Sequence, residues 1–305
     1  MLRRFQFPVL TLLVSLALTF GFAAGPSVRA AAKSSAPGEP AKTCVWKVTA
    51  KDGHTLYLAG SVHALRSSDY PLPKAYDTAF ANCTRLAFEV DPEDMSRMRD
   101  RLVNAASLPR GTQLKDRVDP RTYAYLQRVL AKTKTAEDKI SSYQPWYLAM
   151  RLEMPGGALG LSTSRGIERY LQNKAVATRK PIDGLESWRS HADVYAAMGP
   201  EEAEATLLLS FIQLDGARSE FLRTLTAWRN GDAATVERIM RQEYRNYPVL
   251  YRRLIDARNQ AWLSKIEGWL RKSDTWLVVA GAAHMAGPDG LPEALRARGY
   301  RVEQL

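Results

Sequence analysis

The feature that most constrains the fold is the placement of strand-like segments at both ends of the chain, with helical periodicity between them. We predict strands at 45–49, 55–59, 86–90, 180–183, 276–280 and 300–304. Apolar residues recur at helical spacing over 119–154 and 201–272. These patterns predict an α/β (α+β) fold, in which N- and C-terminal strands form one mixed sheet and a large helical block lies between them. A division near residue 200 is the alternative.

The N-terminus has the pattern of an export signal. Arg3 and Arg4 precede an uncharged run over 7–24, and small residues follow at 28–32. We predict a signal peptide over 1–30, a flexible linker over 31–42 and a folded domain over 43–305. The mature protein is then expected to be periplasmic or secreted. A retained membrane anchor is the alternative, because the apolar run is just long enough to span a bilayer.

The composition is that of a globular protein with a basic surface. Hydrophobic residues make up 46% of the chain and charged residues 25%, which excludes disorder and leaves enough material for a core. The net charge is +11, and removal of residues 1–30, with three Arg and no acid, leaves +8 (11 − 3). Because the basic residues are scattered among acids, we expect no nucleic-acid partner. Membrane contact is expected only through an uncleaved signal segment.

Two cysteines are too few for a disulfide-dense scaffold or a Cys-rich zinc module. Cys44 begins the first predicted strand and Cys83 precedes the third. Exported thiols tend to be oxidised, so we predict a Cys44–Cys83 disulfide between neighbouring strand ends. Two buried free thiols are the alternative.

Two segments far apart in the chain carry the same motif. Residues 58–63 and 279–284 both contain Ala-Gly-x-x-His at the end of an apolar strand, which singles out His63 and His284. Gly permits a sharp turn where a strand leaves the sheet, and a His three residues later can point over the edge of the sheet. Ligands of open α/β sheets bind at that edge, so both histidines are predicted to lie in one site.

Acidic residues follow two further predicted strands. Glu89 ends one, and Glu186 follows another, with His191 five residues later. Two histidines with one or two carboxylates are sufficient ligands for Zn²⁺, Mn²⁺ or Co²⁺. Metal-free chemistry is the alternative, with a histidine as general base and a carboxylate to orient it. No Gly-x-Ser-x-Gly elbow surrounds Ser61, which disfavours a serine hydrolase.

A charged residue occupies the apolar stripe of a helix predicted over 248–271. Arg258 has Ile255 and Trp262 as its neighbours on that stripe, at steps of three and four residues. A guanidinium there requires a buried anion. We predict that Arg258 faces the strand-end acids, either as an anion clamp or as a structural ion pair.

The motifs resemble those of the TraB/PrgY/GumN family, which is related to the animal Tiki proteins and more distantly to erythromycin esterase and ChaN-like proteins. The resemblance extends from about Cys44 to Leu305. Its marks lie at 57–63, 70–73, 86–91, 166–168, 184–187, 258–259 with Trp262, 278–291 and 295–302.

The resemblance implies a Tiki-like fold and a metallohydrolase-like site. It implies that His63, Glu89 and His284 bind a divalent metal (Mn, Co or Zn), and that Arg258 acts beside them. Glu186 and His191 are the further catalytic candidates, as base or as partner of a ligand. The implied activity is metal-dependent hydrolysis of a peptide or ester bond by an exported enzyme. The alternatives are a non-catalytic protein that binds a peptide or glycan, and a metal-free, esterase-like hydrolase.

Overall fold

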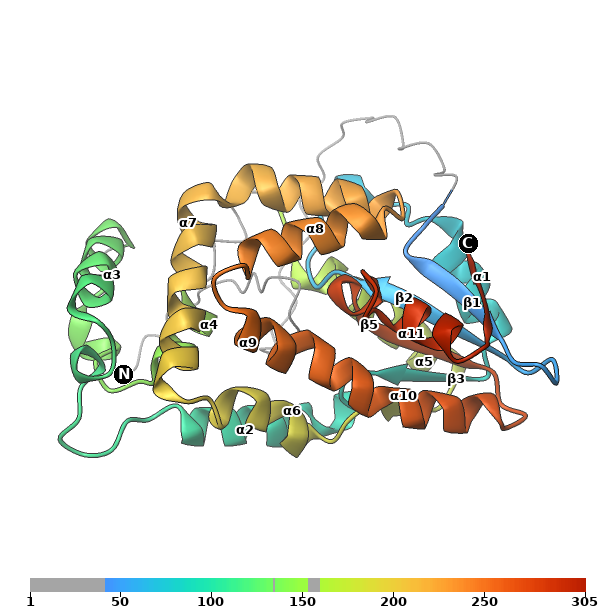
Figure 1. Cartoon of the computed structure of the whole chain (residues 1–305), viewed down its shortest axis with the longest axis horizontal. Helices are drawn as coiled ribbons and strands as arrows, with labels where there is room; N and C mark the ends of the chain where they lie inside the picture. Colours follow the sequence, from blue (N-terminus) through green and yellow to red (C-terminus); the bar gives the residue numbers. More distant parts are fainter. Residues whose placement is uncertain (1–41, 134, 153–159) are drawn as a thin grey trace.

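The structure is a computed structural model that describes residues 42–133, 135–152 and 160–305 (Figure 1). The predicted signal peptide, and all of the predicted linker except Lys42, lie outside the described residues. Among the residues described, no helix combines the length and apolar character needed to cross a bilayer. The predicted domain boundaries stay a prediction.

The predicted strands form one mixed sheet of six strands, in the order β4-β3-β5-β2-β1-β6. Strands β2, β5, β3 and β4 run parallel, whereas β1 is antiparallel to both of its neighbours. The C-terminal strand therefore closes one edge of a sheet that the N-terminal hairpin begins, which confirms the predicted fold class. Their bounds are β1 Val45–Thr49, β2 Thr55–Ser61, β3 Arg85–Phe88, β4 Ile182–Gly184, β5 Trp276–Gly281 and β6 Arg301–Gln304.

Local sequence explains these strands. The turn between β1 and β2 places Gly53 at a φ of 91°, a conformation that glycine adopts without steric cost. All six residues of β5, from Trp276 to Gly281, are buried. A continuous apolar strand of this kind is typical of the centre of a parallel sheet with both faces covered.

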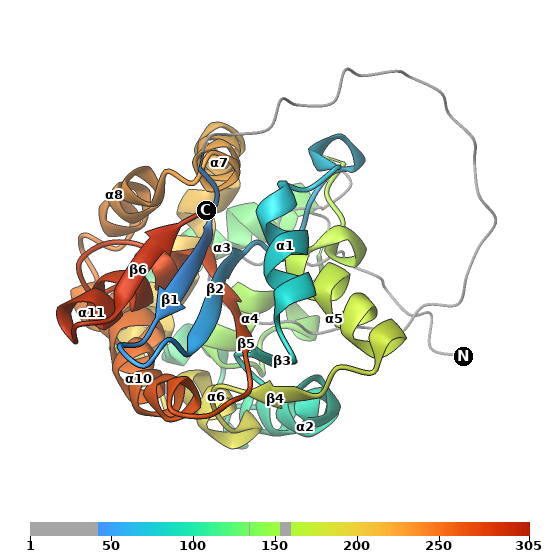
Figure 2. The same cartoon turned by 90° about the vertical axis from the view of Figure 1, so that its right-hand side faces the viewer.

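Helices cover both faces of the sheet. In Figure 2, α1 and α5 lie on one face, while α10 and α11 lie on the other. The helices α3 and α4 and the first part of the long α7 lie away from the sheet, and the end of α7 returns to it, where Nε1 of Trp228 donates to the carbonyl oxygen of Gly60 (2.9 Å) (Figure 1). The bounds are α1 Lys74–Asn82, α2 Met95–Ala105, α3 Pro120–Thr133, α4 Pro145–Arg151, α5 Ile167–Thr178, α6 Trp188–Ala196, α7 Pro200–Arg229, α8 Ala233–Glu243, α9 Pro248–Tyr251, α10 Ala257–Leu270 and α11 Leu291–Ala297.

The helix predicted over 248–271 forms, but with a wider turn in the middle. A π-helical turn, Arg252–Asp256, joins α9 to α10. The predicted apolar stripe is confirmed, because Ile255, Arg258 and Trp262 are all at least 95% buried. Turns of π geometry are frequent at functional sites, and this one ends two residues before Arg258.

The predicted Cys44–Cys83 disulfide is wrong. Both thiols are free and buried in the structure. Cys44 precedes β1, whose start pairs with the end of β2 at Ala59, so it lies at the carboxyl edge of the parallel strands. Cys83 precedes β3, which runs parallel to β5, so it lies at the opposite edge. The prediction assumed that neighbouring strand ends would meet, but because β1 runs against the parallel strands, its start and the start of β3 lie at opposite edges of the sheet.

Candidate active site

The four parallel strands all end at one edge of the sheet, and each is followed by an ionisable side chain. His63 follows β2, Glu89 follows β3, Glu186 follows β4, and His284 lies in the short 3₁₀ turn after β5. Because parallel strands share their direction, their carboxyl ends bring these residues to the same side of the molecule. The repeated Ala-Gly-x-x-His motif thus places its two histidines at one edge, as predicted.

Arg258 connects most of these groups. Its Nη2 donates to an oxygen of Glu89 and to Oε1 of Glu186 (2.6 Å), and its Nε also donates to Oε1 of Glu186 (3.0 Å). Nη1 donates to the carbonyl oxygen of Leu254 (3.1 Å) in the π-helical turn. Burial disfavours the charged guanidinium, but the two carboxylates raise the pKa of Arg258 above its ordinary value. The predicted contact between Arg258 and the strand-end acids is therefore present.

His284 is neutral and fixed in one tautomer by its neighbours. Arginine can only donate, so the 3.1 Å contact with Nη1 of Arg258 makes Nε2 of His284 an acceptor. Nδ1 then carries the proton and donates to Oδ1 of Asn259 (2.7 Å). The Asn259 amide donates in turn to the carbonyl oxygens of His284 (3.2 Å) and Asp289 (2.9 Å). Burial lowers the pKa of His284 from 6.5 to about 3, so it stays neutral near pH 7.

Glu186 and His191 form a buried pair beside Arg258. His191 lies in α6. Its Nδ1 is 2.8 Å from Oε1 of Glu186 and 3.1 Å from Nη2 of Arg258. Burial alone would raise the pKa of Glu186, but the charge of Arg258 and the contact with His191 hold it below its usual value. The sequence left open whether His191 faces solvent, and the structure buries it at 2% exposure.

A second ionisable pair involves His63 and a residue that the sequence analysis did not single out. Nδ1 of His63 lies 2.7 Å from Oε1 of Glu168, which also accepts a hydrogen bond from the buried Ser61 hydroxyl (2.6 Å). Burial would raise the pKa of Glu168, but His63 and these hydrogen bonds lower it. Glu168 is therefore an ionised carboxylate that orients the imidazole.

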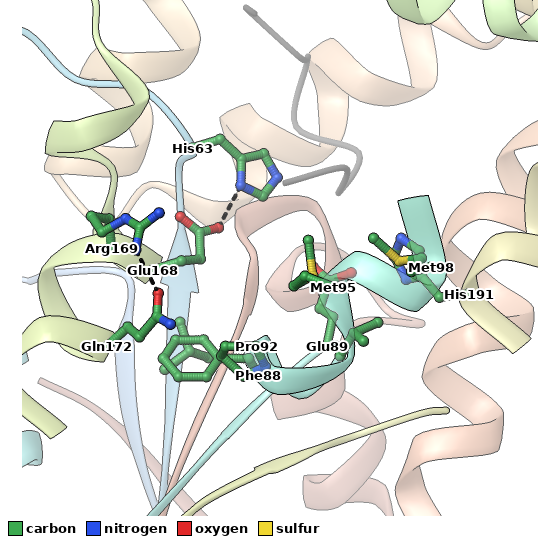
Figure 3. A pocket seen from close by; sticks show the side chains of 12 residues that line it. His63, Phe88, Glu89, Pro92, Met95, Met98, Glu168, Arg169, Gln172 and His191 are labelled. Carbon is green, nitrogen blue, oxygen red and sulfur yellow. Dashed lines mark hydrogen bonds and ion pairs between the residues drawn. The ribbon is translucent and has the colours of Figure 1, made fainter. Parts of the chain in front are cut away.

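His63 and Glu168 line a pocket with a cavity volume of about 110 Å³ together with Glu89 and His191, whereas Glu186, Arg258 and His284 are not among its lining residues. The two histidines that were predicted to lie in one site, His63 and His284, therefore share a sheet edge but not this pocket. Figure 3 shows the pair of His63 and Glu168 on one side and Glu89 and His191 on another. The remaining walls are mainly apolar and come from the ends of β3 and β5, the segment after β3, and α2. The apolar lining residues are Phe88, Val90, Pro92, Met95, Met98 and Val279.

Three of the buried groups could hold a metal ion. One donor atom from each of Glu89, Glu186 and His191 lies within 4.8 Å of the others. Two carboxylates and an imidazole suit Mn²⁺, Co²⁺ or Zn²⁺, so the donor types fit a divalent cation. This group shares only Glu89 with the ligand set that the resemblance implies. His63 and His284 instead contact Glu168 and Arg258, and Arg258 already supplies positive charge to both carboxylates.

The sequence contained one signal for Glu168. It follows Gly166-Ile167, a segment that resembles the family, and it lies in the first turn of α5, where a carboxylate is favoured by the helix dipole. Nothing in the spacing linked it to His63, which is 105 residues earlier. Asn259 stands beside Arg258 in a segment that resembles the family, but its contact with His284, which fixes the tautomer, is visible only in the folded chain.

The fold and the site define a class of α+β proteins in which parallel strands bring two histidine-containing clusters, one half-buried and one buried, to the same edge of the sheet. The chain matches the TraB/PrgY/gumN family model over residues 44–304 and belongs to that family. No match was found among curated proteins or among solved structures.

Proposed function

We propose that this chain is an exported hydrolase of peptide or ester bonds, with His63 and Glu168 as its acid–base pair. The observation that carries the proposal is the 2.7 Å contact between Nδ1 of His63 and Glu168 at the wall of the pocket. A histidine held by a carboxylate through one ring nitrogen can exchange a proton through the other. Family membership and the N-terminal sequence support hydrolysis and export respectively.

The buried Ser61 supports this pair through a hydrogen bond to Glu168. Its hydroxyl donates to the Glu168 oxygen that contacts His63, which fixes the position of the carboxylate. The Ser61 hydroxyl donates to a carboxylate. In a serine hydrolase, the hydroxyl of the nucleophile donates to the imidazole that acts as base. The proposed attacking group is therefore a water molecule from which His63 takes a proton.

A divalent cation at Glu89, Glu186 and His191 is part of the proposal, and its binding requires Nη2 of Arg258, which contacts all three groups, to move away from them. When bound, such a cation polarises a substrate carbonyl or lowers the pKa of a water molecule. Glu89 is held in place by the backbone N–H of Gly281, which donates to its Oε1 (2.9 Å). Arg258 donates to the second oxygen of Glu89 and to Glu186, so its positive charge lies against both carboxylates.

The test is a screen of the purified mature protein against peptide and ester substrates, with and without added Mn²⁺, Co²⁺ or Zn²⁺. His63→Gln and Glu168→Gln should each lower kcat by about 10²- to 10⁴-fold, and the double variant should lose little more than the worse single variant. Glu243 is a half-buried glutamate outside the pocket. Glu243→Gln is therefore the control and should leave kcat unchanged. Turnover that survives both substitutions would reject the hydrolase, and a peptide- or glycan-binding protein would then be favoured.

Metal dependence has its own readout. Glu186→Gln and His191→Gln should each reduce the bound metal measured by elemental analysis, because ligands of one centre act together. Wild-type protein that gains no thermal stability from any of the three ions would remove the metal from the proposal and leave the pair of His63 and Glu168.

A further inference from the structure

Arg169 is a cation on the wall of the pocket that has no close counter-ion among the residues the structure describes. It lies in α5, directly after Glu168, and its side chain lines the pocket (Figure 3). Its Nη1 donates to Oε1 of Gln172, three residues later in the same helix (3.2 Å). No carboxylate among the described residues lies within 4.0 Å of its guanidinium nitrogens. Gln172 therefore orients the guanidinium but does not neutralise it.

Other half-buried arginines of this chain have stronger partners. Arg253 forms a two-bond ion pair with Glu202, at 2.8 and 3.0 Å. Arg165 donates to two backbone carbonyl oxygens, those of Leu65 and Gly160. A guanidinium has five donors, and taking it partly out of water is costly when they are not satisfied. Arg169 thus has donor capacity that a ligand in the pocket can use.

The charges around Arg169 favour a ligand with one negative charge. Glu89 and Glu168 line the same pocket, and each is already engaged by a positive or donor group, Arg258 and His63 respectively. A dianion such as a phosphate would be repelled by these two carboxylates, whereas a carboxylate matches the planar fork of a single guanidinium. The apolar walls include Met95 and Met98 of α2, which suit an aliphatic side chain.

We propose that Arg169 binds the free carboxylate of a substrate that carries an apolar side chain, such as the C-terminal residue of a peptide or an N-acyl amino acid. The inference rests on the proposed function, because it names the substrate class of the same pocket. Gln172 is then a positioning residue for the guanidinium. Hydrolysis would take place next to a free carboxyl end, and an amidated substrate would be disfavoured.

The test measures binding without turnover. N-acetyl-L-methionine and N-acetyl-L-methioninamide are titrated into the mature protein by calorimetry, and the two probes differ only in the carboxylate. The acid should bind about 10- to 100-fold more tightly than the amide. Arg169→Gln should abolish that difference, and Arg169→Lys should retain part of it because charge is kept but the fork is lost. Arg179→Gln, an exposed arginine that caps α5, is the matched control and should bind like the wild type.

Equal binding of acid and amide by the wild type would overturn the inference, as would absence of binding by both probes at millimolar concentration. The inference would also be overturned if Arg169→Gln kept the wild-type melting temperature and still bound the acid more tightly than the amide. The proposed function can fail independently of this inference. If the protein hydrolyses no substrate but still prefers the acid through Arg169, the carboxylate site is supported and the hydrolase is rejected.

Discussion

Arg258 is the single residue on which most of the buried charge depends. It contacts Glu89, Glu186 and His284, and it is 5% exposed. Its guanidinium also lies over the ring of Trp262, 4.7 Å from the ring centroid, which is favourable for a cation. A buried guanidinium between two carboxylates is retained because the loss of any one member leaves an uncompensated charge.

Replacement of this residue should therefore be costly. We expect Arg258→Met to lower the free energy of unfolding by about 3–5 kcal/mol, because Glu89 and Glu186 would stay buried without their cation. Urea unfolding at pH 7 measures the loss. Arg97→Met breaks an exposed ion pair with Asp94 and should cost at most about 1 kcal/mol. A similar small loss for both variants would show that the carboxylates do not depend on Arg258.

His284 makes stability depend on pH. In the folded chain its pKa is about 3, whereas the same imidazole in the unfolded chain takes up a proton near its ordinary value of 6.5. Between these values the unfolded chain binds more protons, so the free energy of unfolding should fall as the pH falls from 6.5 toward 3. One proton gives a slope of at most about 1.4 kcal/mol per pH unit.

The measurement is urea unfolding between pH 7 and pH 5. His284→Gln should give a shallower slope than the wild type, whatever its absolute stability. Asn82→Gln, an exposed substitution at the end of α1, removes no titratable group and is the control, which should leave the slope unchanged. A wild-type slope in His284→Gln would contradict the assignment of this pH dependence to His284.

At the scale of elements, the site depends on how closely the start of α5 approaches the end of β2. Gly166 precedes α5, and the backbone N–H of Ile167 donates to the carbonyl oxygen of Val62 (3.1 Å). A Cβ added at Gly166 would lie 2.2 Å from the carbonyl oxygen of His63. Glycine is therefore needed here for close approach, and that approach is what brings Glu168 to His63.

Gly166→Ala should push α5 away from the histidine. We expect the free energy of unfolding to fall by about 1–3 kcal/mol, and the proposed hydrolysis to fall as it would in Glu168→Gln. Gly199 precedes α7 with a similar extended backbone, but a Cβ there would meet its nearest atom at 3.9 Å. Gly199→Ala is thus the matched control and should be tolerated. Equal effects of the two substitutions on stability and activity would argue against a requirement for close packing at Gly166.

At the scale of the whole molecule, the sheet separates the two cysteines, although both lie near strand starts. Burial raises the pKa of the Cys44 thiol to about 12 and also raises that of Cys83, so little reactive thiolate forms at either residue. We expect a thiol reagent to label neither cysteine in the native mature protein and both after denaturation without reductant. Peptide mapping that recovers a cross-linked pair of Cys44 and Cys83 would contradict this topology.

Much of the fold could be predicted because it depends on local patterns. Alternation and apolar runs located the strands to within a few residues, and helical spacing placed Arg258 on a buried stripe. Both signals act over a few neighbouring residues, so the order of amino acids is sufficient to reveal them. The repeated Gly-x-x-His motif likewise indicated that His63 and His284 leave the sheet at one edge.

What only the tertiary structure decided is which side chains meet. The sequence by itself determined the strand ends, the helical block and the need of Arg258 for a buried anion. The approach of α5 that brings Glu168 to His63, and the amide of Asn259 that fixes His284, both came from packing. These contacts join residues far apart in the chain, and their distances depend on how helices and strands pack, which no local spacing records.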